Sequence, residues 1–369
     1  MGGEAEERRW KRDGSVCYRV VAQHICCEGD GVILSQSLFM VLSKQKRKRL
    51  IAKELHLAIV CLIAWMTVFT GVVSAQAVSS LESIDAIPYN ITSPRYYILN
   101  INYTGSGEYA IVISASDVVL DLNEHIINNS GILCECESNV TVINGVVTLS
   151  QMYFDCVSKG KIEHVKFDLG DIYLKESKSI EISNNTWIDS QGISITLEGC
   201  TDVIIKNNTI RGSLTLLGSQ KIEIINNTFI GQPIEPCLEI AIDLRESSDN
   251  TIYGNTYTGI WIYDSNTQQY YPSGLFGIYL ENSNRNKLLN NEIEGTCGGI
   301  KLYSSTENII FRNKLKDNIN GTTVIDSINN VFYLNDFVNN TVNVYSKNST
   351  NIWNSTTVYS VHLQQIQCS

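Results

Sequence analysis

Short runs of alternating apolar and polar residues recur through the second half of the chain. IEISNNTWID (180–189), VIIKNNTIRG (203–212) and IEIINNTFIG (222–231) share one pattern, in which a pair of asparagines separates two such runs. Alternation with a period of two predicts half-buried β-strands. Each unit therefore predicts two short strands with a sharp turn between them.

The units recur at a nearly even spacing along the chain. When the sequence is aligned on an Asn that precedes a large apolar residue by two positions, the successive spacings are 21, 21, 20, 23, 19, 28, 36, 22 and 22. A further alternating run, such as GIYLENS, lies in each unit, and no linker is long enough for a helix. Three short strands per repeat predict one coil of a parallel β-helix, with about eleven coils and an all-β fold.

The aligned asparagines predict a ladder of stacked side chains. An inward Asn at a turn can bond both its own turn and the amide one coil away, because the amide carries donors and an acceptor. Val165 fills one slot of the alignment. The predicted ladder residues are Asn123, Asn144, Asn185, Asn208, Asn227, Asn255, Asn291, Asn313 and Asn335. The residue before the slot is often Asn or Gly, which tolerate a positive φ.

The segment 1–75 differs from the rest of the chain. Residues 40–75 combine a basic stretch, KQKRKRLIAK, with an apolar run from Leu55 to Val73 and small residues at the end, which is typical of a signal peptide or an uncleaved signal-anchor helix. Residues 1–39 lack periodicity, and we interpret them as a mis-assigned or disordered extension before Met40. We expect 76–107 to be an N-terminal cap, 108–357 the parallel β-helix, and 358–369 a tail that is truncated.

Charge separates along the same boundary. Residues 1–75 hold 11 Lys/Arg and 7 Asp/Glu, a net of +4, whereas residues 76–369 hold 17 and 31, a net of −14. An acidic domain is a poor partner for nucleic acid, because phosphate contacts need Lys and Arg. We therefore expect no nucleic-acid partner. From the signal-like segment we expect an exported protein at the cell surface, outside the cell or in the periplasm, with the N-terminal segment as its link to a membrane.

Seven cysteines follow residue 75, an odd number, so at least one is unpaired or intermolecular. The separation of Cys136 and Cys156 along the chain is close to one coil. Stacked neighbours could reach disulfide distance, but two buried, unlinked thiols are the preferred interpretation.

Several stretches resemble the NosD-like family of right-handed parallel β-helices with a pectin-lyase-like fold. DVVLDLNEHIINN (117–129) looks like the opening coil of that family, VTVINGVVT (140–148) looks like the second, and NSTNIWNSTT (348–357) is similar to the segment after the last coil. The resemblance covers roughly residues 95–357 and implies a single-stranded, right-handed β-helix. It also implies a periplasmic role in maturing a copper enzyme.

The residues do not predict a copper site, and no metal or other cofactor is evident. The exported part has three histidines, His125, His164 and His362. His125 and His164 stand at different offsets from the ladder slot, so their side chains are expected to project differently. Satisfied surface histidines are the preferred interpretation.

The repeat is interrupted twice, and the interruptions predict a binding face over residues 231–279. The two long spacings, 28 and 36, place extra residues around GQPIEPC (231–237) and IWIYDSNTQQYYPSG (260–274). Long loops often carry function. Aromatic rings cover the apolar face of a sugar, and carboxylates accept its hydroxyl bonds. The predicted substrate-binding residues are Trp261, Tyr263, Tyr270, Tyr271 and Tyr279.

Catalysis is less well supported. Glu239, Asp243 and Asp264 are candidate acids, with Glu235 nearby, and Arg245 stands beside Asp243. Period two predicts that Asp243 points outward, in register with Tyr279 and Lys301. A glycosidase needs two carboxylates about 5–9.5 Å apart, which register alone does not provide. A lyase would call for an acidic cluster with bound Ca²⁺ and a basic Arg.

The sequence therefore leads to three functional hypotheses. The first is an exported carbohydrate-binding or surface-structural β-helix, with a polysaccharide or glycoprotein of the cell envelope as its partner. The second is a polysaccharide lyase or hydrolase acting at 231–279, and the third is a NosD-like accessory protein for copper delivery. Packing of the long loops on the rod is the alternative to a sugar site. Of eleven Asn-x-Ser/Thr motifs after residue 75, Asn90 and Asn102 are the best glycosylation candidates, because they lie outside the ladder repeats.

Overall fold

The structure, a computed structural model, describes residues 81–354 apart from 191, 233–238 and 265–267, together with three two-residue strands elsewhere. The chain divides into two units, 1–75 and 76–369. In the first unit, β1 (Lys11–Arg12) pairs with β2 (Ser15–Val16) in antiparallel orientation. Most of the predicted extension and all of the predicted signal segment, 40–75, lie outside the described residues. Within the described part of the chain, no helix has the length and apolarity to cross a membrane.

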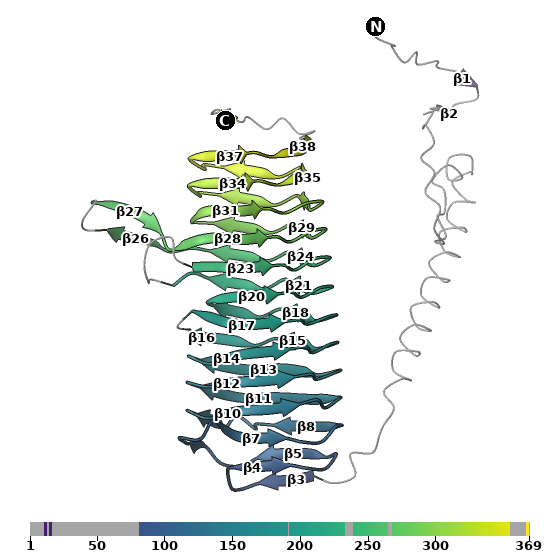
Figure 1. The fold of residues 1–369 in the computed structure, drawn as a ribbon, viewed down its shortest axis with the longest axis vertical. Helices are drawn as coiled ribbons and strands as arrows, with labels where there is room; N and C mark the ends of the chain where they lie inside the picture. Colours follow the sequence, from purple (N-terminus) through teal and green to yellow (C-terminus); the bar gives the residue numbers. More distant parts are fainter. Residues whose placement is uncertain are drawn as a thin grey trace. The chain divides into compact units, whose positions relative to one another are not determined.

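The second unit is a parallel β-helix, as predicted (Figure 1). One side is a 13-stranded sheet in which each strand pairs in parallel with its equivalent in the next coil. Its strands are β4 (Tyr89–Ile91), β7 (Tyr109–Ile113), β10 (Gly131–Glu135), β12 (Gln151–Asp155), β14 (Asp171–Lys175), β17 (Ile193–Glu198), β20 (Ser213–Leu217), β23 (Glu239–Arg245), β28 (Gly274–Glu281), β31 (Thr296–Tyr303), β34 (Asn320–Ile325), β37 (Val342–Lys347) and β39 (Gln367–Cys368). We call its solvent side the outer face.

Two further stacks complete each coil, and the long strands β11 (Val140–Thr148) and β13 (Lys161–Asp168) run through both. One stack contains β3 (Leu81–Ile84), β5 (Tyr96–Leu99), β8 (Val118–Asp121), β15 (Glu181–Ser183), β18 (Ile204–Lys206), β21 (Glu223–Ile225), β24 (Thr251–Tyr253), β29 (Lys287–Leu289), β32 (Ile309–Phe311), β35 (Ile328–Tyr333) and β38 (Thr350–Asn354). The other contains β6 (Tyr103–Thr104), β9 (Ile126–Asn128), β16 (Thr186–Asp189), β19 (Thr209–Arg211), β22 (Thr228–Ile230), β25 (Thr256–Thr258), β30 (Glu292–Glu294), β33 (Lys314–Lys316) and β36 (Asp336–Val338).

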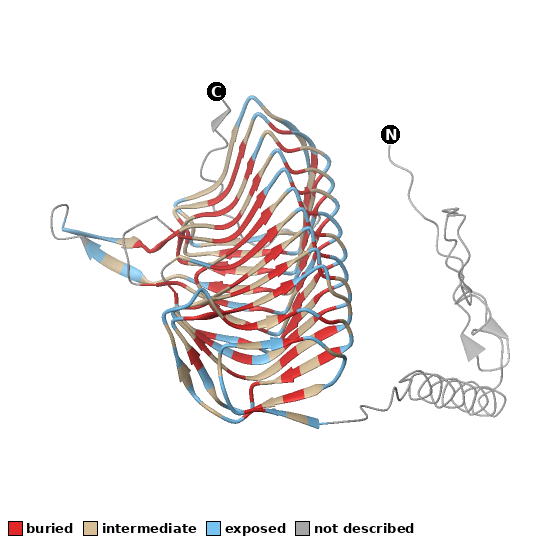
Figure 2. Cartoon of the chain, turned by 60° about the horizontal axis from the view of Figure 1, so that its bottom comes forward, coloured by how far each residue is buried: buried red, intermediate tan, exposed pale blue. Residues whose placement is uncertain are grey.

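Apolar side chains from all three stacks fill the interior, and Figure 2 shows the buried residues alternating along the strands. Equivalent residues stack from coil to coil, because parallel strands in register place them one strand spacing apart, roughly 4.8 Å. The rings of Phe167 and Trp187, for example, lie 4.6 Å apart and within 11° of parallel. The repeat therefore stacks similar side chains on one another in the core.

The coils begin earlier than the sequence pattern predicted. Residues 76–107 were expected to be a cap, but β3 pairs with β5, and β5 pairs with β8. In the same way β4 pairs with β7, so these strands already belong to the stack. The first strands are two to four residues long, and they lack the Asn repeat by which the later coils were recognised.

The asparagine ladder runs through seven of the nine predicted residues. Asn185 Nδ2 donates to Asn208 Oδ1 at 3.1 Å, and the same bond links each member to the next as far as Asn335. Each Oδ1 also accepts the backbone N–H of the preceding member, as Asn208 Oδ1 does from Asn185 N at 2.8 Å. All seven Nδ2 groups donate to a backbone carbonyl of an earlier coil as well. Each amide thus satisfies backbone groups that the turn leaves unpaired.

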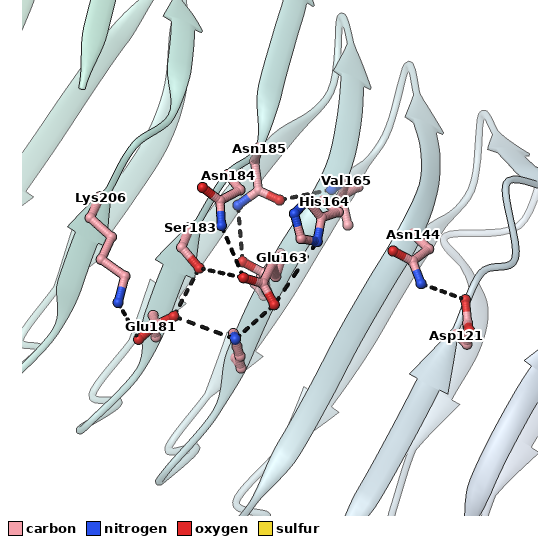
Figure 3. Close-up of polar contacts among 12 residues, drawn as sticks. Asp121, Asn144, Glu163, His164, Val165, Glu181, Ser183, Asn184, Asn185 and Lys206 are labelled. Atoms are coloured by element: carbon pink, nitrogen blue, oxygen red, sulfur yellow. Dashed lines mark hydrogen bonds and ion pairs between the residues drawn. The ribbon is translucent and has the colours of Figure 1, made fainter. Parts of the chain in front are cut away.

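Asn123 and Asn144 were wrongly assigned to this ladder. Strand pairing aligns Gly145, not Asn144, with Val165, the residue whose N–H donates to Asn185 Oδ1 (Figure 3). Asn144 instead has φ 56° and donates to Asp121 Oδ1, and Asn123 has φ 48°. The ladder position at Gly145 has no room for a side chain, because an added Cβ would lie 2.3 Å from Leu122 Cβ.

The first Asn of each Asn-Asn pair adopts a left-handed conformation, as expected. The φ angles are 57° at Asn184, 56° at Asn207, 53° at Asn226 and 54° at Asn290. Gly254 fills the equivalent position with φ 66°, and an added Cβ there would lie 2.5 Å from Asn226 Oδ1. The turn therefore requires a residue that tolerates positive φ immediately before the inward Asn.

Two further ladders, one of serines and one of asparagines, stack at another turn of the coil and were not predicted. Serine hydroxyls accept the N–H of the equivalent residue one coil earlier, as Ser283 Oγ does from Ser247 N at 3.0 Å. Each of these serines is followed three positions later by an asparagine, and these asparagines form the second ladder. Asn250 N donates to Asn286 Oδ1 at 2.9 Å, and Asn286 N donates in turn to Asn308 Oδ1. The Ser-x-x-Asn spacing in SSDN, SNRN and STEN carries this signal in the sequence.

Candidate functional site

The second predicted insertion forms a hairpin that projects from the solenoid (Figure 1). Its strands, β26 (Trp261–Asp264) and β27 (Gln269–Pro272), pair antiparallel, with Tyr263 opposite Tyr270. The two tyrosine rings lie 5.1 Å apart. Trp261, Tyr263 and Tyr270 are 46%, 52% and 65% exposed, so the hairpin presents aromatic surface to solvent. Tyr271, the fourth predicted aromatic residue of the loop, is half-buried and donates to Gln269 Oε1.

The hairpin leads directly into β28, whose outer face carries further aromatic residues. Phe276 and Tyr279 stack with their centroids 5.5 Å apart. Lys301 on β31 lies over both rings, with Nζ 4.7 Å from the Phe276 centroid and 5.2 Å from that of Tyr279. Asp243, Tyr279 and Lys301 are in register across three coils, as the sequence predicted. Phe276 was missed, because it directly follows a register shift between β23 and β28.

Asp243 lies between the core residues Ile242 and Leu244 and faces outward, but it is only 5% exposed. Its Oδ2 accepts from Arg245 Nε at 3.1 Å, and Arg245 Nη2 lies 3.0 Å from the same atom. Its Oδ1 is buried and has no partner among the described residues. Burial raises the pKa of Asp243, and Arg245 only partly opposes that shift. The site thus contains a shielded carboxyl group with one oxygen unused.

Glu239 occupies the start of β23, where the first insertion rejoins the coil. It is 6% exposed, and its Oε2 accepts the backbone N–H of Gln232 at 3.0 Å, so it ties the two ends of the loop together. Its Oε1, the Tyr257 hydroxyl and Gln232 Nε2 are buried without partners in the described structure. Burial also raises the pKa of Glu239, against the effect of backbone hydrogen bonds.

The candidate catalytic residues are not brought together as a pair. Glu239 and Asp243 are four positions apart on one strand, which places their Cα atoms roughly 13 Å apart at about 3.3 Å per residue. Asp264 lies opposite Gln269 in the hairpin, but the placement of its side chain is outside the described residues, as is Glu235. The Cα separation of Glu239 and Asp243 exceeds the distance of about 5–9.5 Å between carboxyl groups that a glycosidase needs.

Copper, which the family resemblance implies, does not fit the described residues. No group of three or more His, Cys, Asp or Glu side chains converges in the described part of the chain. His125 Nδ1 lies 3.2 Å from Asn102 Oδ1, and His164 lies beside Glu163 at 4.0 Å. A copper site built from imidazole or thiolate ligands needs several such side chains around one point. His362 is outside the described residues.

Cys136 and Cys156 lie in register on adjacent coils, directly after the paired residues Glu135 and Asp155. Both thiols are free and, contrary to the preferred interpretation, exposed rather than buried. The side-chain hydrogen bond to Cys156 raises the pKa of Cys136 to about 11. The two sulfur atoms are therefore close enough to interact without being linked. Cys297 on β31 is disulfide-bonded.

The two glycosylation candidates are exposed. Asn90 Oδ1 accepts from Ser114 Oγ at 3.1 Å, and Asn102 Oδ1 accepts the backbone N–H of Ile126 at 2.9 Å. Neither contact uses the side-chain nitrogen to which a glycan is attached, so modification at both remains a prediction.

Two solved structures resemble the fold over most of the described residues. PfbA, a surface adhesin of Streptococcus pneumoniae, matches with a TM-score of 0.51 and 12% identity, covering 72% of this chain and 84% of that chain. Tailspike protein 3 of bacteriophage CBA120 matches with a TM-score of 0.52 and 12% identity, covering 77% of this chain and 56% of that chain. Similarity at this level of identity reports the β-helix fold alone. No curated protein matches the sequence.

A family model matches most of the second unit. Its description is periplasmic copper-binding protein (NosD), and it aligns with residues 88–272 and 262–365. The two matches meet in the hairpin insertion, so the interruption lies within a continuous set of family repeats. Together they cover well over half of the sequence, and the chain therefore belongs to the NosD family.

Proposed function

We propose that this protein is an exported β-helix protein that binds carbohydrate at the surface formed by the β26–β27 hairpin and the outer face of β23, β28 and β31. The single observation that carries the proposal is the cluster of Phe276, Tyr279 and Lys301 beside Asp243 and Arg245. The proposed partner is a polysaccharide or glycoprotein of the cell envelope.

The chemistry of the cluster suits a sugar. Stacked aromatic rings offer a flat apolar surface for the C–H face of a pyranose, and the neighbouring charged groups offer hydrogen bonds to its hydroxyls. Lys301 Nζ lies over both rings, which fixes an ammonium donor directly against the aromatic surface. The exposed Trp261, Tyr263 and Tyr270 extend the aromatic surface beyond the coil. PfbA, which shares the fold, is described as a surface adhesin, and the role proposed here is of that kind.

A glycan array probed with the full-length protein tests the proposal. We expect selective binding to a small set of glycans, and we expect Tyr279→Ala or Trp261→Ala to weaken it roughly tenfold or more, since an aromatic contact contributes on the order of 1 kcal/mol beyond its buried area. Tyr253→Ala is the matched control, because Tyr253 is 41% exposed but belongs to β24 in another stack. Absence of binding to any glycan, or equal loss in the control, would contradict the proposal.

Cleavage of the bound polysaccharide is the second candidate function. The observation favouring it is the raised pKa of Asp243 and Glu239, since a carboxyl group that keeps its proton toward neutral pH can act as a general acid. Arg245 beside Asp243 is the basic residue that a lyase would use, with Ca²⁺ as its metal. Product analysis by mass spectrometry after long incubation with the bound glycan separates cleavage from binding. Unchanged chain length would leave binding as the function.

A further inference from the structure

The two insertions leave and rejoin the solenoid at neighbouring coils. The first lies between β22 and β23, and the hairpin lies between β25 and β28. Because β22 pairs with β25 and β23 pairs with β28, the ends of one insertion stack on the ends of the other. Gly231 N, for example, donates to Thr258 O at 2.9 Å. We call the residues at these junctions the stems, which are 231, 232 and 239 for the first insertion and 259, 260, 273 and 274 for the hairpin.

Tyr257 brings a hydroxyl group from the core to these stems. It occupies an inward position of β25, where its neighbours in register on β22 and β30 are apolar. An added Cβ at Gly231 would lie 2.9 Å from Tyr257 Oη, and one at Gly274 would lie closer still. Gly274 is the residue paired with Glu239. The hydroxyl therefore lies beside stem residues of both insertions, in space that two glycines leave open.

Three polar atoms at this place are buried without a hydrogen-bond partner among the described residues. They are Gln232 Nε2, Glu239 Oε1 and Tyr257 Oη, and their side chains are between 3% and 6% exposed. Gln232 and Glu239 are in direct contact, because Gln232 N donates to Glu239 Oε2 at 3.0 Å. Burial is the main cause that raises the pKa of Tyr257, and the charge of Glu239 raises it further, which places the carboxylate near the hydroxyl. Buried polar groups are rarely left unpaired, so three together indicate a shared partner.

The hydrogen-bonding chemistry of the three atoms matches a water molecule. The amide nitrogen of Gln232 can only donate, the carboxylate oxygen of Glu239 can accept, and the hydroxyl of Tyr257 can do either. A water can accept from the amide and donate to the two oxygens. Buried waters typically make about three hydrogen bonds to groups that would otherwise be unsatisfied. A metal cation fits less well, because the amide nitrogen offers a proton and not a lone pair.

We propose that Gln232, Glu239 and Tyr257 bind one internal water molecule, and that this water links the stems of the two insertions. The first insertion supplies the amide and the carboxylate, and the coil that leads into the hairpin supplies the hydroxyl. A water shared in this way holds the insertions to the solenoid as one unit, so loosening of one stem is transmitted to the other. This inference does not depend on carbohydrate binding, because it concerns the support of the loops and not their ligand.

A crystal structure of the full-length wild type, at a resolution that shows ordered water, tests the site directly. We expect density for one water within hydrogen-bond distance of Gln232 Nε2, Glu239 Oε1 and Tyr257 Oη. A direct hydrogen bond between Glu239 Oε1 and Tyr257 Oη with no water between them, or a metal ion at this position, would overturn the proposal. This arm needs no variant, so it decides the question even if a substitution prevents folding.

Hydrogen exchange of backbone N–H groups tests the link between the insertions. Tyr257→Phe removes one partner of the water and keeps the ring. The N–H groups of Gln232 in the first insertion and Ile260 in the hairpin are both expected to exchange about fivefold faster in this variant. Tyr253→Phe is the matched control, because it removes the hydroxyl of an exposed tyrosine in another stack. Unchanged or slower exchange at Gln232 would contradict the link, since removal of a hydroxyl that has no partner relieves a cost.

Discussion

Asn227 Nδ2 donates to Asn255 Oδ1 at 3.0 Å across a long stretch of sequence, and the N–H of Asn227 donates to the same oxygen at 2.9 Å. Asn227 Oδ1 in turn accepts the N–H of Asn208 at 3.0 Å. The side chain also caps the carbonyl of Ile205 at 2.8 Å. One amide thus satisfies backbone groups of the coils on both sides, including the long one that contains the first insertion.

Asn227→Ala is expected to destabilise the protein. The change leaves the N–H of Asn208 and the carbonyl of Ile205 without these partners, and each buried orphan costs about 1–3 kcal/mol. We expect a lower free energy of unfolding and a clearly lower Tm in thermal denaturation followed by circular dichroism.

Asn226→Gly is the matched control. It removes the glycosylation acceptor of the same Asn-Asn-Thr motif, and glycine adopts the positive φ that Asn226 has. Its Tm should stay close to that of the wild type, whereas Asn227→Ala keeps the acceptor and loses the ladder. If Asn226→Gly were the destabilising change and Asn227→Ala were neutral, the glycan and not the ladder would support this coil.

Oxidation of Cys136 and Cys156 to a disulfide is expected to be slow at neutral pH and faster in alkali. The thiolate is the nucleophile in thiol–disulfide exchange, and the pKa of Cys136 is raised to about 11. Incubation with oxidised glutathione at pH 7 and at pH 10, followed by non-reducing peptide mapping, measures the linked fraction. Cys156→Ser should yield no linked peptide of this pair. Failure to link at pH 10 would show that the sulfur atoms do not approach each other.

Stability is expected to fall with rising pH because of Glu239. Burial raises the pKa of Glu239 in the folded state above its unfolded value of about 4.3, so the folded state holds the proton more tightly. The contribution is complete below the unfolded pKa and is lost as pH rises through the folded pKa. Between pH 4 and pH 7, the Tm of the wild type should therefore decline relative to that of Glu239→Gln. Glu223→Gln, at an exposed position on β21, should follow the wild type.

Copper retention is not expected to depend on the described histidines. His125 and His164 contact Asn102 and Glu163 rather than each other, and no cluster of three metal ligands is present in the described range. After copper loading and desalting, His125→Ala and His164→Ala should retain as much metal per chain as the wild type, as measured by plasma mass spectrometry. Loss of one bound copper per chain in either variant would contradict this expectation, because it would show that the substituted histidine binds copper.

Much of the fold could be predicted from sequence because the same constraint recurs in every coil. A pair of asparagines with strands on both sides identifies the turn at Asn184 and Asn185, and the hydrogen bonds follow from stacking. The prediction went wrong at Asn144, because a shift of one residue is invisible until strand pairing places Gly145 opposite Val165. Spacing from one Asn to the next apolar residue cannot distinguish the inward position from the left-handed one before it.

The candidate site was predictable only in part. The alternation of apolar and polar residues correctly placed Asp243, Tyr279 and Lys301 in register, because their alignment depends on strand pairing alone. It could not show that Asp243 is covered, because burial of an outward residue depends on side chains from neighbouring coils. Phe276 was missed for a different reason, because the register shift between β23 and β28 that places it beside Tyr279 and Lys301 cannot be read from the spacing of the repeat.

The most direct test of carbohydrate binding is a crystal structure of the protein with the glycan that binds best. Our account predicts electron density for a sugar ring stacked on Phe276 and Tyr279, within hydrogen-bond distance of Lys301. Density for the glycan elsewhere on the surface, with these two rings left bare, would contradict it.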